Sequence, residues 1–297
     1  MRALIARPGT PVPQLVEVAD PTPGPGEVAI RTTAATVNPV DVNVASGAAR
    51  ELFGLVGDVG LGWDFSGTVV AVGADVATVR TGQRVAAVTT DLNQLTRAHA
   101  EVVVVPAPSV AAVPDGLDDA AAATVSLNAL TAAQIVDLLG ASDGRTLLVT
   151  GAAGAVGGYV LVLAADAGWQ VTGLARETDR DFVTGTGARL VTELPERAYD
   201  AVADAGALQQ DGIGAVVDSG VFVGVLPPLP VPSERGIEVK AVFVQPDGAR
   251  LAGLLERSVT GELGVRVAQT VPFEDYQEAY DAVAVPHGRR GRVVLTF

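Results

Sequence analysis

An uncharged run of twenty residues, from Thr146 to Ala165, constrains the fold of this chain more than any other feature. By length and apolar character alone, the run would suit a helix that spans a membrane. Its β-branched part ends at Thr150, however, and glycines follow at positions 151, 154, 157 and 158. This pattern favours a strand, a glycine-rich turn and a helix over one continuous membrane helix.

The glycine-rich turn predicts a dinucleotide-binding unit. Gly151 would make the tight turn, Gly154 would let the backbone approach a diphosphate, and Gly157 would let the helix pack closely on the strand. A second apolar strand follows, which completes a strand–helix–strand unit of about thirty residues. The helix N-terminus would face the diphosphate, and the residues expected to contact it are Gly151, Ala153, Gly154, Ala155 and Val156. Close packing without any ligand is the alternative interpretation.

The end of the second strand bears on which cofactor binds. Units that bind NAD usually carry Asp or Glu at this point, which accepts hydrogen bonds from the ribose 2′-OH. This strand ends in Ala175 and Arg176 instead, and Arg180 follows shortly after. A guanidinium pairs well with a 2′-phosphate, so the pattern favours NADPH. The alternative is that Arg176 is a solvated loop residue and that Glu177 binds the ribose.

The composition excludes several kinds of partner and metal site. The 297 residues carry a net charge of −14, which argues against nucleic acid or an anionic membrane surface as a partner. The absence of cysteine excludes disulfides and thiolate zinc sites, and two histidines, His99 and His287, are too few for a His-rich metal centre. The apolar run at the N-terminus is too short for a signal peptide. We therefore expect a soluble, cytoplasmic protein.

The residue composition and the pattern of predicted strands and helices change twice along the chain. Residues 1–116 contain short segments rich in Val, Thr, Gly and Pro, which predict an all-β, barrel-like domain. Residues 117–262 alternate apolar strands with alanine-rich helices, which predicts a parallel sheet built from βαβ units. Residues 263–297 predict a strand, an amphipathic helix and a terminal strand. The predicted fold class is therefore α/β, with an additional β domain.

Several segments together resemble the zinc-independent medium-chain dehydrogenase/reductases of the NADPH:quinone oxidoreductase (zeta-crystallin-like) family. The resemblance covers nearly the whole chain and implies a Rossmann-type doubly wound parallel sheet inserted into a GroES-like β-barrel domain, to which the C-terminal segment returns. It also implies a homodimer that pairs through the edge strand "IEVKAVFV". The segments that carry it are "GPGEVAIRTTAATVNPVDVNVASG" (24–47), "GLGWDFSGTVVAVGADV" (60–76), "AAAATVSLNALTAAQIV" (120–136), "GAAGAVGG" (151–158), "ERGIEVKAVFVQPDG" (234–248) and "RGRVVLTF" (290–297).

The chain departs from the zinc-dependent members of that family at their metal site. Those enzymes carry a cysteine at a position that matches residues 38–41, and a Gly-His-Glu sequence where this chain has Gly62-Trp63-Asp64. Without zinc there is no Lewis acid to stabilise an alkoxide, whose conjugate acid has a pKa of about 15.7. A phenolic oxygen has a pKa of about 10, so a hydroquinone or enol product asks for roughly 8 kcal/mol less charge stabilisation. We therefore expect hydride transfer to a quinone or an α,β-unsaturated carbonyl.

The resemblance implies roles for three polar residues outside the glycine turn. Asn38 would lie near the nicotinamide and the substrate oxygen, as a cofactor contact and a catalytic donor to the developing oxyanion; a turn asparagine before Pro39 is the alternative. Asp41 would orient the neighbouring backbone or the cofactor ribose, with a helix N-cap as the alternative. Thr131 would lie beside the nicotinamide, unless its hydroxyl bonds back to its own helical turn.

Apolar residues complete the expected site. Phe243 and Val244 match the segment that passes the nicotinamide in the family, although both would also suit the core of a strand. Val225 lies in a turn at the carboxyl end of a strand, where ligands bind in open α/β sheets. Phe53 and Trp63 are candidates for an apolar substrate wall, although a large aromatic residue more often belongs to the core.

The sequence reveals no dedicated acid. The tyrosines, at positions 159, 199, 276 and 280, lie in the nucleotide-binding half or the C-terminal helix. His99 is expected to be a structural or surface residue with no catalytic partner, and His287 a surface residue. Two alternatives to a quinone or enone reductase stay open. An enoyl-thioester reductase would need a basic patch, which the scattered arginines of the β domain do not supply, and an NADPH-binding sensor would need no acid.

Overall fold

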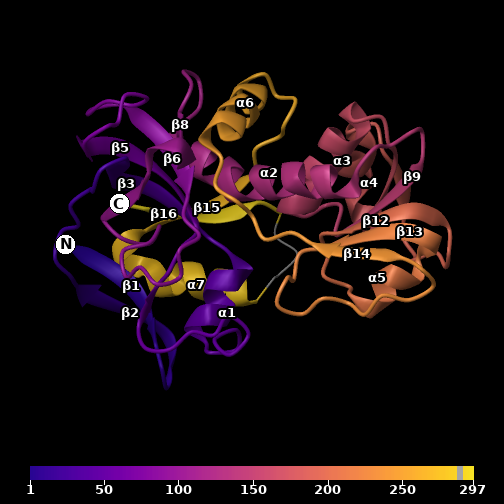
Figure 1. Ribbon diagram of the computed structural model, residues 1–297, viewed down its shortest axis with the longest axis horizontal. Coiled ribbons are helices and arrows are strands. Elements are labelled where there is room, and N and C mark those ends of the chain that lie inside the picture. Colours follow the sequence, from indigo (N-terminus) through magenta and orange to yellow (C-terminus); the bar gives the residue numbers. More distant parts are fainter. Residues whose placement is uncertain (286–289) are drawn as a thin grey trace. The chain divides into compact units, whose positions relative to one another are not determined.

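The computed structural model describes residues 1–285 and 290–297, which form two compact units (Figure 1). Unit 1 consists of Met1–Leu130 and Gln245–Phe297, and unit 2 of Thr131–Val244. The C-terminal segment is therefore part of the first unit. The prediction for His287 falls outside the described residues.

Unit 1 is built on two sheets of short strands. The larger sheet is antiparallel apart from the pair β15–β16, and its order is β15 (Val267–Pro272), β16 (Arg292–Thr296), β3 (Glu27–Val37), β5 (Asp64–Val72), β6 (Arg84–Val88) and β8 (Val110–Ala112), with β7 (Val102–Pro106) also on β3. The smaller sheet has the order β2 (Thr10–Glu17), β1 (Arg2–Arg7) and β4 (Val59–Gly60). The described helical segments of the unit are α1 (Pro39–Ala45), η1 (Ala107–Ser109), the first part of α2 (Asp119–Leu139), α6 (Gly248–Val259), η3 (Phe273–Asp275) and α7 (Tyr276–Ala284).

Two large apolar clusters lie among the described residues of unit 1. One lies inside the larger sheet and includes Ile30, Phe65 and Val103, all fully buried. The other joins α1 and α7 to the sheets through buried residues such as Leu61 and Phe273. Strand β16 pairs antiparallel with the end of β3, with Val293 opposite Val37, so the start of β16 lies beside the start of α1. This pairing brings distant parts of the sequence to the same place.

Unit 2 is one parallel sheet with helices on its faces. Its six strands have the order β11 (Arg189–Val191), β10 (Gln170–Leu174), β9 (Thr146–Thr150), β12 (Tyr199–Asp204), β13 (Val216–Gly224) and β14 (Glu238–Ala241). In chain order this is 3-2-1-4-5-6, the arrangement of a doubly wound dinucleotide-binding sheet. The helical segments are α3 (Ala155–Asp166), η2 (Glu177–Asp179), α4 (Arg180–Gly185) and α5 (Gln210–Gly214). The predicted fold class is confirmed.

The limits of the two units differ from the predicted domain limits of 116/117 and 262/263. Helix α2 (Asp119–Leu139) is alanine-rich throughout, yet its first turn is held by unit 1, because Arg84 pairs with Asp119 at 2.9 Å and Ser66 Oγ donates to the Asp119 carbonyl at 2.7 Å. Helix α6 packs on β8 so closely that a Cβ on Gly248 would lie 2.3 Å from Val110 O. Both helices therefore extend unit 1 at the expense of the predicted central domain.

The uncharged run that suggested a membrane helix is divided between two elements. It forms β9, a turn and the 12-residue helix α3, so the interpretation as a membrane helix is wrong. Among the described residues, α2 is the one helix long and apolar enough to cross a membrane, and 67% of its most apolar window is buried within the protein. Burial of this extent is what a core helix shows.

Candidate cofactor and substrate site

The glycine-rich turn of unit 2 has the geometry that its sequence predicts. Gly151 follows β9 with a φ of +57°, a left-handed conformation that L side chains rarely adopt. Gly154 is the N-cap of α3. A Cβ on Gly157 would lie only 2.3 Å from Gly151 O, so the helix packs against the turn at a distance that only glycine permits. The backbone N–H groups at the start of α3 are therefore presented as an anion site would require.

The strand order of the sheet reverses between β9 and β12, and the two strand ends are linked there. Thr150 Oγ1 donates to Asp204 Oδ1 at 2.6 Å, and the Gly206 N–H donates to Thr150 Oγ1 at 2.9 Å. A Cβ on Gly151 would lie 2.8 Å from Gly206 Cα, so the two loops meet backbone to backbone. Dinucleotides bind at such a reversal point. Sequence reasoning missed Asp204, although a carboxylate that ends a buried strand and precedes a glycine was a usable signal.

The charged loop after β10 contains two arginines with different surroundings. Arg180 is paired with Glu177, with Nη2 to Oε2 at 2.7 Å. Arg176 is 66% exposed, and its nearest carboxylate contact is Asp179 at 3.9 Å. Glu177, the residue expected to bind a ribose in the alternative interpretation, therefore faces Arg180, while Arg176 extends into solvent.

The other cofactor candidates of unit 2 follow the ends of its strands, with one exception. All six strands are parallel, so their carboxyl ends lie at one edge of the sheet. The glycine turn with Ala153, Ala155 and Val156 follows β9, Ala175 follows β10, and Val225 follows β13. Phe243, 40% exposed, and the buried Val244 follow β14. Thr131 instead lies within α2 and is nearly buried.

In unit 1, Asn38 is part of a buried polar cluster. It follows β3, is 3% exposed, and donates from Nδ2 to Asp64 Oδ1 at 2.8 Å. Its Oδ1 accepts a hydrogen bond from Arg292 Nη2, which comes from β16. Sequence reasoning identified Asn38 but neither of these partners. The two segments that match the metal-ligand positions of zinc-dependent relatives are thus joined by a hydrogen bond between an amide and a carboxylate.

Asp41 ties the same two segments together through their backbones. Its Oδ2 accepts from the Asn38 N–H at 2.9 Å, and its Oδ1 accepts from the Gly62 N–H at 2.8 Å. The residue is 1% exposed. Asp41 therefore orients the neighbouring backbone, which is one of the roles expected for it. It does so from the third position of α1, whereas the N-cap of this helix is Asn38.

The carboxyl group of Asp64 is fully buried, and burial raises its pKa to about 6. Hydrogen bonds from Thr36 and Asn38 and the positive charge of Arg292 oppose this rise, because they stabilise the ionised form. Asp64 therefore exchanges its proton near neutral pH. The structure thus reveals a titratable carboxyl group beside Asn38 that the sequence did not indicate.

His99 and Tyr280 form a second buried pair in unit 1. His99 Nε2 lies 2.9 Å from Thr36 O, and Nδ1 lies 2.9 Å from the Tyr280 hydroxyl. A carbonyl only accepts, so Nε2 carries the proton and Nδ1 accepts from the tyrosine. Burial lowers the pKa of His99 and raises that of Tyr280, which keeps both neutral. His99 was expected to be structural or on the surface, and it is buried. The expectation that the tyrosines lie away from the β domain is wrong for Tyr276 and Tyr280, which lie in α7 of unit 1.

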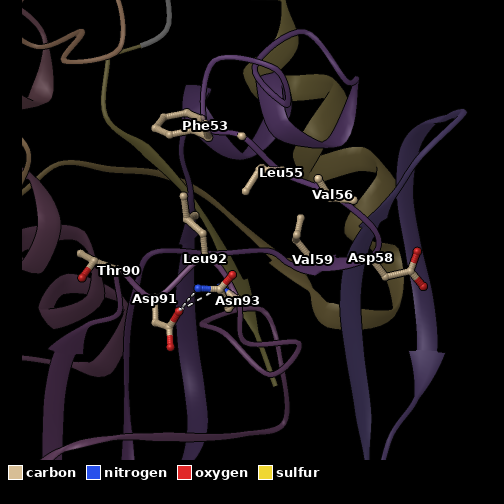
Figure 2. A pocket seen from close by; sticks show the side chains of 10 residues that line it. Phe53, Leu55, Val56, Asp58, Val59, Thr90, Asp91, Leu92 and Asn93 are labelled. Carbon is tan, nitrogen blue, oxygen red and sulfur yellow. Dashed lines mark hydrogen bonds between the residues drawn. The ribbon is translucent and has the colours of Figure 1, made fainter.

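A pocket with a volume of about 370 Å³ opens on unit 1 between two loops (Figure 2). Phe53 and its neighbours as far as Val59 form one wall, and residues 90–93 form the other. Trp63 is instead buried, with the Arg97 guanidinium 4.6 Å from the centre of its ring. Arg97 Nη1 and Nη2 donate to Gly60 O at 3.3 Å and to Thr89 O at 3.1 Å, immediately behind the two walls. Phe53 therefore lines the pocket, whereas Trp63 is buried outside its lining.

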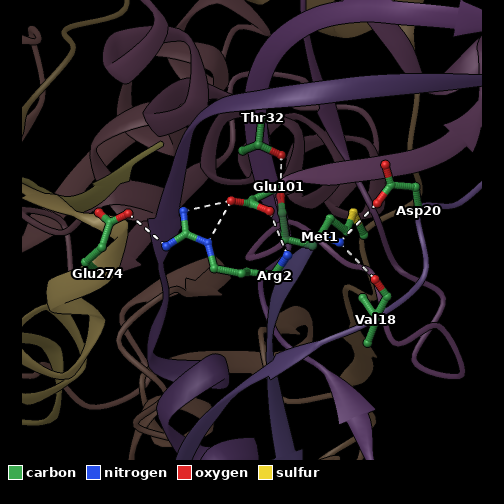
Figure 3. A network of polar contacts seen from close by, with 8 residues as sticks. Met1, Arg2, Val18, Asp20, Thr32, Glu101 and Glu274 are labelled. Atoms are coloured by element: carbon green, nitrogen blue, oxygen red, sulfur yellow. Dashed lines mark hydrogen bonds and ion pairs between the residues drawn. The ribbon is translucent and has the colours of Figure 1, made fainter.

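A further polar network in unit 1 joins the N-terminal strand to the rest of the unit (Figure 3). Arg2 pairs with Glu101 at 2.7 Å and with Glu274 at 2.9 Å, and the N-terminal amine donates to Val18 O at 2.9 Å. These contacts connect β1 with the start of β7 and with η3. They hold strands together and offer no nucleophile or metal ligand set.

The GroES-like part of the chain has a recognised counterpart. Residues 24–115 match the family model described as the alcohol dehydrogenase GroES-like domain. A solved alcohol dehydrogenase superfamily protein from Novosphingobium aromaticivorans is 28% identical, with a TM-score of 0.83 over 100% of this chain and 99% of that one. The chain thus contains an alcohol dehydrogenase GroES-like domain, and it shares its fold with the medium-chain dehydrogenase/reductases.

Relatives of similar sequence include proteins named for quinones. A chloroplastic quinone-oxidoreductase homologue from Spinacia oleracea is 33% identical over 197 residues, covering 64% of this chain and 60% of that protein. A quinone oxidoreductase from Pseudomonas aeruginosa is 27% identical over 326 residues, covering 95% and 96%. An erythronolide synthase from Saccharopolyspora erythraea is 30% identical over 301 residues, covering 91% of this chain and 8% of the synthase. The chain thus spans well under the full length of the first and last of these relatives.

The residues at the position of the family's zinc site do not suit that metal. Zinc binds thiolate, imidazole and carboxylate groups, whereas this chain offers the neutral amide of Asn38 and a carboxylate, Asp64, that accepts hydrogen bonds from Asn38 and Thr36. The guanidinium of Arg292 already brings a positive charge to the same place. Across the described ranges, no three His, Cys, Asp or Glu residues gather as a metal site.

Proposed function

We propose that the protein is an NADPH-dependent reductase that transfers hydride to a quinone or an α,β-unsaturated carbonyl without zinc. The observation that carries this proposal is the meeting of the Gly151 and Gly206 loops, where the order of a parallel sheet reverses. Relatives named quinone oxidoreductase support the choice of acceptor. The bound nicotinamide would supply the hydride.

The preference for NADPH rests on the loop after β10. Arg176 is largely exposed and has only a long contact with Asp179, so its guanidinium is available to a 2′-phosphate. Glu177, which would bind the ribose of NADH, is already paired with Arg180. The two residues therefore favour the same cofactor.

The acceptor class follows from the donor set in unit 1. Asn38 offers a hydrogen-bond donor, and water would supply the proton. Ordinary donors suffice for an oxyanion of phenol or enol type, which is far less basic than an alkoxide. The pocket beside Phe53 would receive the acceptor.

Turnover of purified protein tests the proposal directly. We expect loss of nicotinamide absorbance when NADPH is mixed with 9,10-phenanthrenequinone or an enone, and none with a simple ketone. Dialysis against a chelator should leave the rate unchanged. Binding of NADPH without turnover of any acceptor would instead indicate a sensor, and absence of binding to either nicotinamide cofactor would exclude the whole proposal.

An enoyl-thioester reductase is the second candidate, because the erythronolide synthase aligns with 91% of this chain and a mycocerosic acid synthase-like polyketide synthase with 66%. Crotonyl-CoA in the same assay separates the two, since faster turnover of the thioester than of the quinone would favour this candidate.

We also propose a cytoplasmic location and a homodimer. Strand β14 is the edge of its sheet, so a second copy would add to it there. Light scattering of the protein as it elutes from a size-exclusion column measures its mass in solution, and a mass twice that of one chain would support the homodimer.

A further inference from the structure

The side-chain amide of Asn38 lies between two groups of opposite charge. Its Nδ2 donates to Asp64 and its Oδ1 accepts from Arg292. A carboxylate only accepts hydrogen bonds, and a guanidinium only donates them. Only one of the two orientations of the amide therefore satisfies both neighbours.

Each charged neighbour is itself held by a second element. Arg292 Nη2 also donates to Val37 O at 2.9 Å. Asp64 Oδ1, which accepts the hydrogen bond from Asn38, also accepts one from Thr36 Oγ1. Asp64 Oδ2 accepts a hydrogen bond from the Leu127 N–H at 3.3 Å. The contacts come from β3, β5, β16 and α2, so turning either charged group would break a bond to another part of unit 1.

We infer that Asp64 and Arg292 are positioning residues that hold the Asn38 amide in the one orientation that points its NH2 group away from Arg292. This deepens the proposed function and rests on it for the place of Asn38 beside the substrate. The arrangement also selects which of the two N–H groups of the Asn38 amide is available to a substrate oxygen. One N–H is committed to Asp64 at 2.8 Å, while Nδ2 has longer contacts with Thr36, at 3.2 Å to Oγ1 and 3.4 Å to the carbonyl. The second N–H exchanges the weaker contact for a substrate oxygen.

The arrangement depends on the ionised form of Asp64. Arg292 faces this carboxyl from β16 and favours ionisation, Asp41 faces it from α1 and opposes ionisation, and burial raises its pKa to about 6. Protonation removes the negative charge that holds the Asn38 NH2 group. The reductase rate is therefore expected to fall on the acid side of this pKa.

Substitutions at the two charged residues test the inference through kinetics. Arg292→Met should lower kcat by about 10- to 100-fold and leave the KM for NADPH within about twofold, whereas Arg292→Lys should recover part of the loss. Asp64→Asn should remove the acid-side fall in kcat. The exposed residues Arg31 and Asp115 supply matched controls, Arg31→Met and Asp115→Asn, which should behave like the unsubstituted protein. An unchanged kcat in Arg292→Met, or an intact acid-side fall in Asp64→Asn, would overturn the inference.

A spectroscopic readout separates this inference from the proposed function. The side-chain ¹H–¹⁵N signals of Asn38, assigned by their loss in Asn38→Asp, should shift with a midpoint near pH 6 in the unsubstituted protein. They should not titrate in Asp64→Asn, and their positions should change in Arg292→Met but little in Arg292→Lys. If these shifts occur and no acceptor is reduced, the proposed function fails and the positioning stands. If an acceptor is reduced and the signals ignore both substitutions, the positioning fails alone.

Discussion

Thr150 and Asp204 end neighbouring strands and share a hydrogen bond of 2.6 Å where the strand order of unit 2 reverses. Asp204 is fully buried and also accepts from the backbone N–H groups of Leu208 at 3.0 Å and Gln209 at 2.8 Å. The pair therefore fixes both loops that would border the dinucleotide. Their separation and direction are set before any ligand arrives.

Replacing Thr150 with valine should loosen both loops, because valine keeps the shape and removes the hydroxyl. Asp204 then loses a donor and the Gly206 N–H loses its acceptor, which should cost about 1–3 kcal/mol of unfolding free energy and weaken NADPH binding. Denaturant unfolding and cofactor titration measure the two effects. Thr150→Ser keeps the oxygen and should resemble the unsubstituted protein. Equal stability and affinity in Thr150→Val would show that the link is dispensable.

Arg176→Ala should raise the KM for NADPH by about tenfold or more and leave the KM for NADH nearly unchanged, since only NADPH carries the 2′-phosphate. Steady-state kinetics with both cofactors measure the ratio. Arg180→Ala is the comparison, and its effect should be smaller because Arg180 already pairs with Glu177. A parallel change in both KM values would contradict the assignment of NADPH.

The glycine turn was predictable from sequence because its requirements are local. The positive φ of Gly151 is a property of its own backbone, and a Cβ on Gly157 would meet Gly151 O six positions away, so a single segment reveals why each position favours glycine. Strand and helix alternation likewise predicted the parallel sheet. The resemblance to a known family added the return of the last strand to the first unit.

The polar cluster around Asn38 was not predictable in the same way. Arg292 is 254 residues away from Asn38 in sequence, and Tyr280 is 181 residues away from His99. No local pattern distinguishes the half-buried Arg292 in "RGRVVLTF" from a surface arginine. The limit of unit 1 within α2 was missed for a related reason, because the alanine-rich pattern is uniform while the contacts that divide it come from distant residues such as Arg84.

Phe53→Ala should raise the KM for a bulky quinone by about tenfold, through loss of part of an aromatic contact, and leave the KM for NADPH unchanged. Phe53 lines the pocket of unit 1 and is half-buried. Val56 lines the same pocket but is 93% exposed, so Val56→Ala should have little effect and serves as the control. Equal KM values for the quinone in both variants would place the acceptor elsewhere.

Asp64 should make stability depend on pH in an unusual direction. Its folded pKa of about 6 lies above the ordinary value of 3.8, so the folded protein holds the proton more tightly than the unfolded chain. Its contribution is therefore fully present below pH 3.8 and is lost as the pH rises to about 6, a difference of roughly 3 kcal/mol. Unfolding at several pH values should show the unsubstituted protein gaining stability relative to Asp64→Asn as the pH falls through this interval.

His99 acts in the opposite direction and must be separated from that measurement. Burial lowers its pKa below the ordinary 6.5, so the unfolded chain takes up a proton that the folded protein does not, and stability falls as the pH drops below 6.5. Comparing the His99→Gln variant with the double variant His99→Gln, Asp64→Asn removes the effect of His99 from the measurement. A stability difference that stays constant from pH 4 to pH 7 would contradict the elevated pKa of Asp64.

Arg97 should matter for the shape of the pocket more than its burial suggests. It is 1% exposed, burial lowers its pKa to about 10, and its two terminal nitrogens hold the carbonyls of Gly60 and Thr89 behind opposite walls. Arg97→Met removes a costly buried charge but leaves both carbonyls without these donors, so we expect a net loss of about 1–3 kcal/mol in unfolding free energy. The KM for the quinone should rise while the KM for NADPH stays constant. Arg97→Lys keeps the charge, but its single amine does not bridge both carbonyls, so the KM for the quinone should rise in this variant too. A KM that rises in Arg97→Met but not in Arg97→Lys would assign the effect to the charge rather than to the bridge.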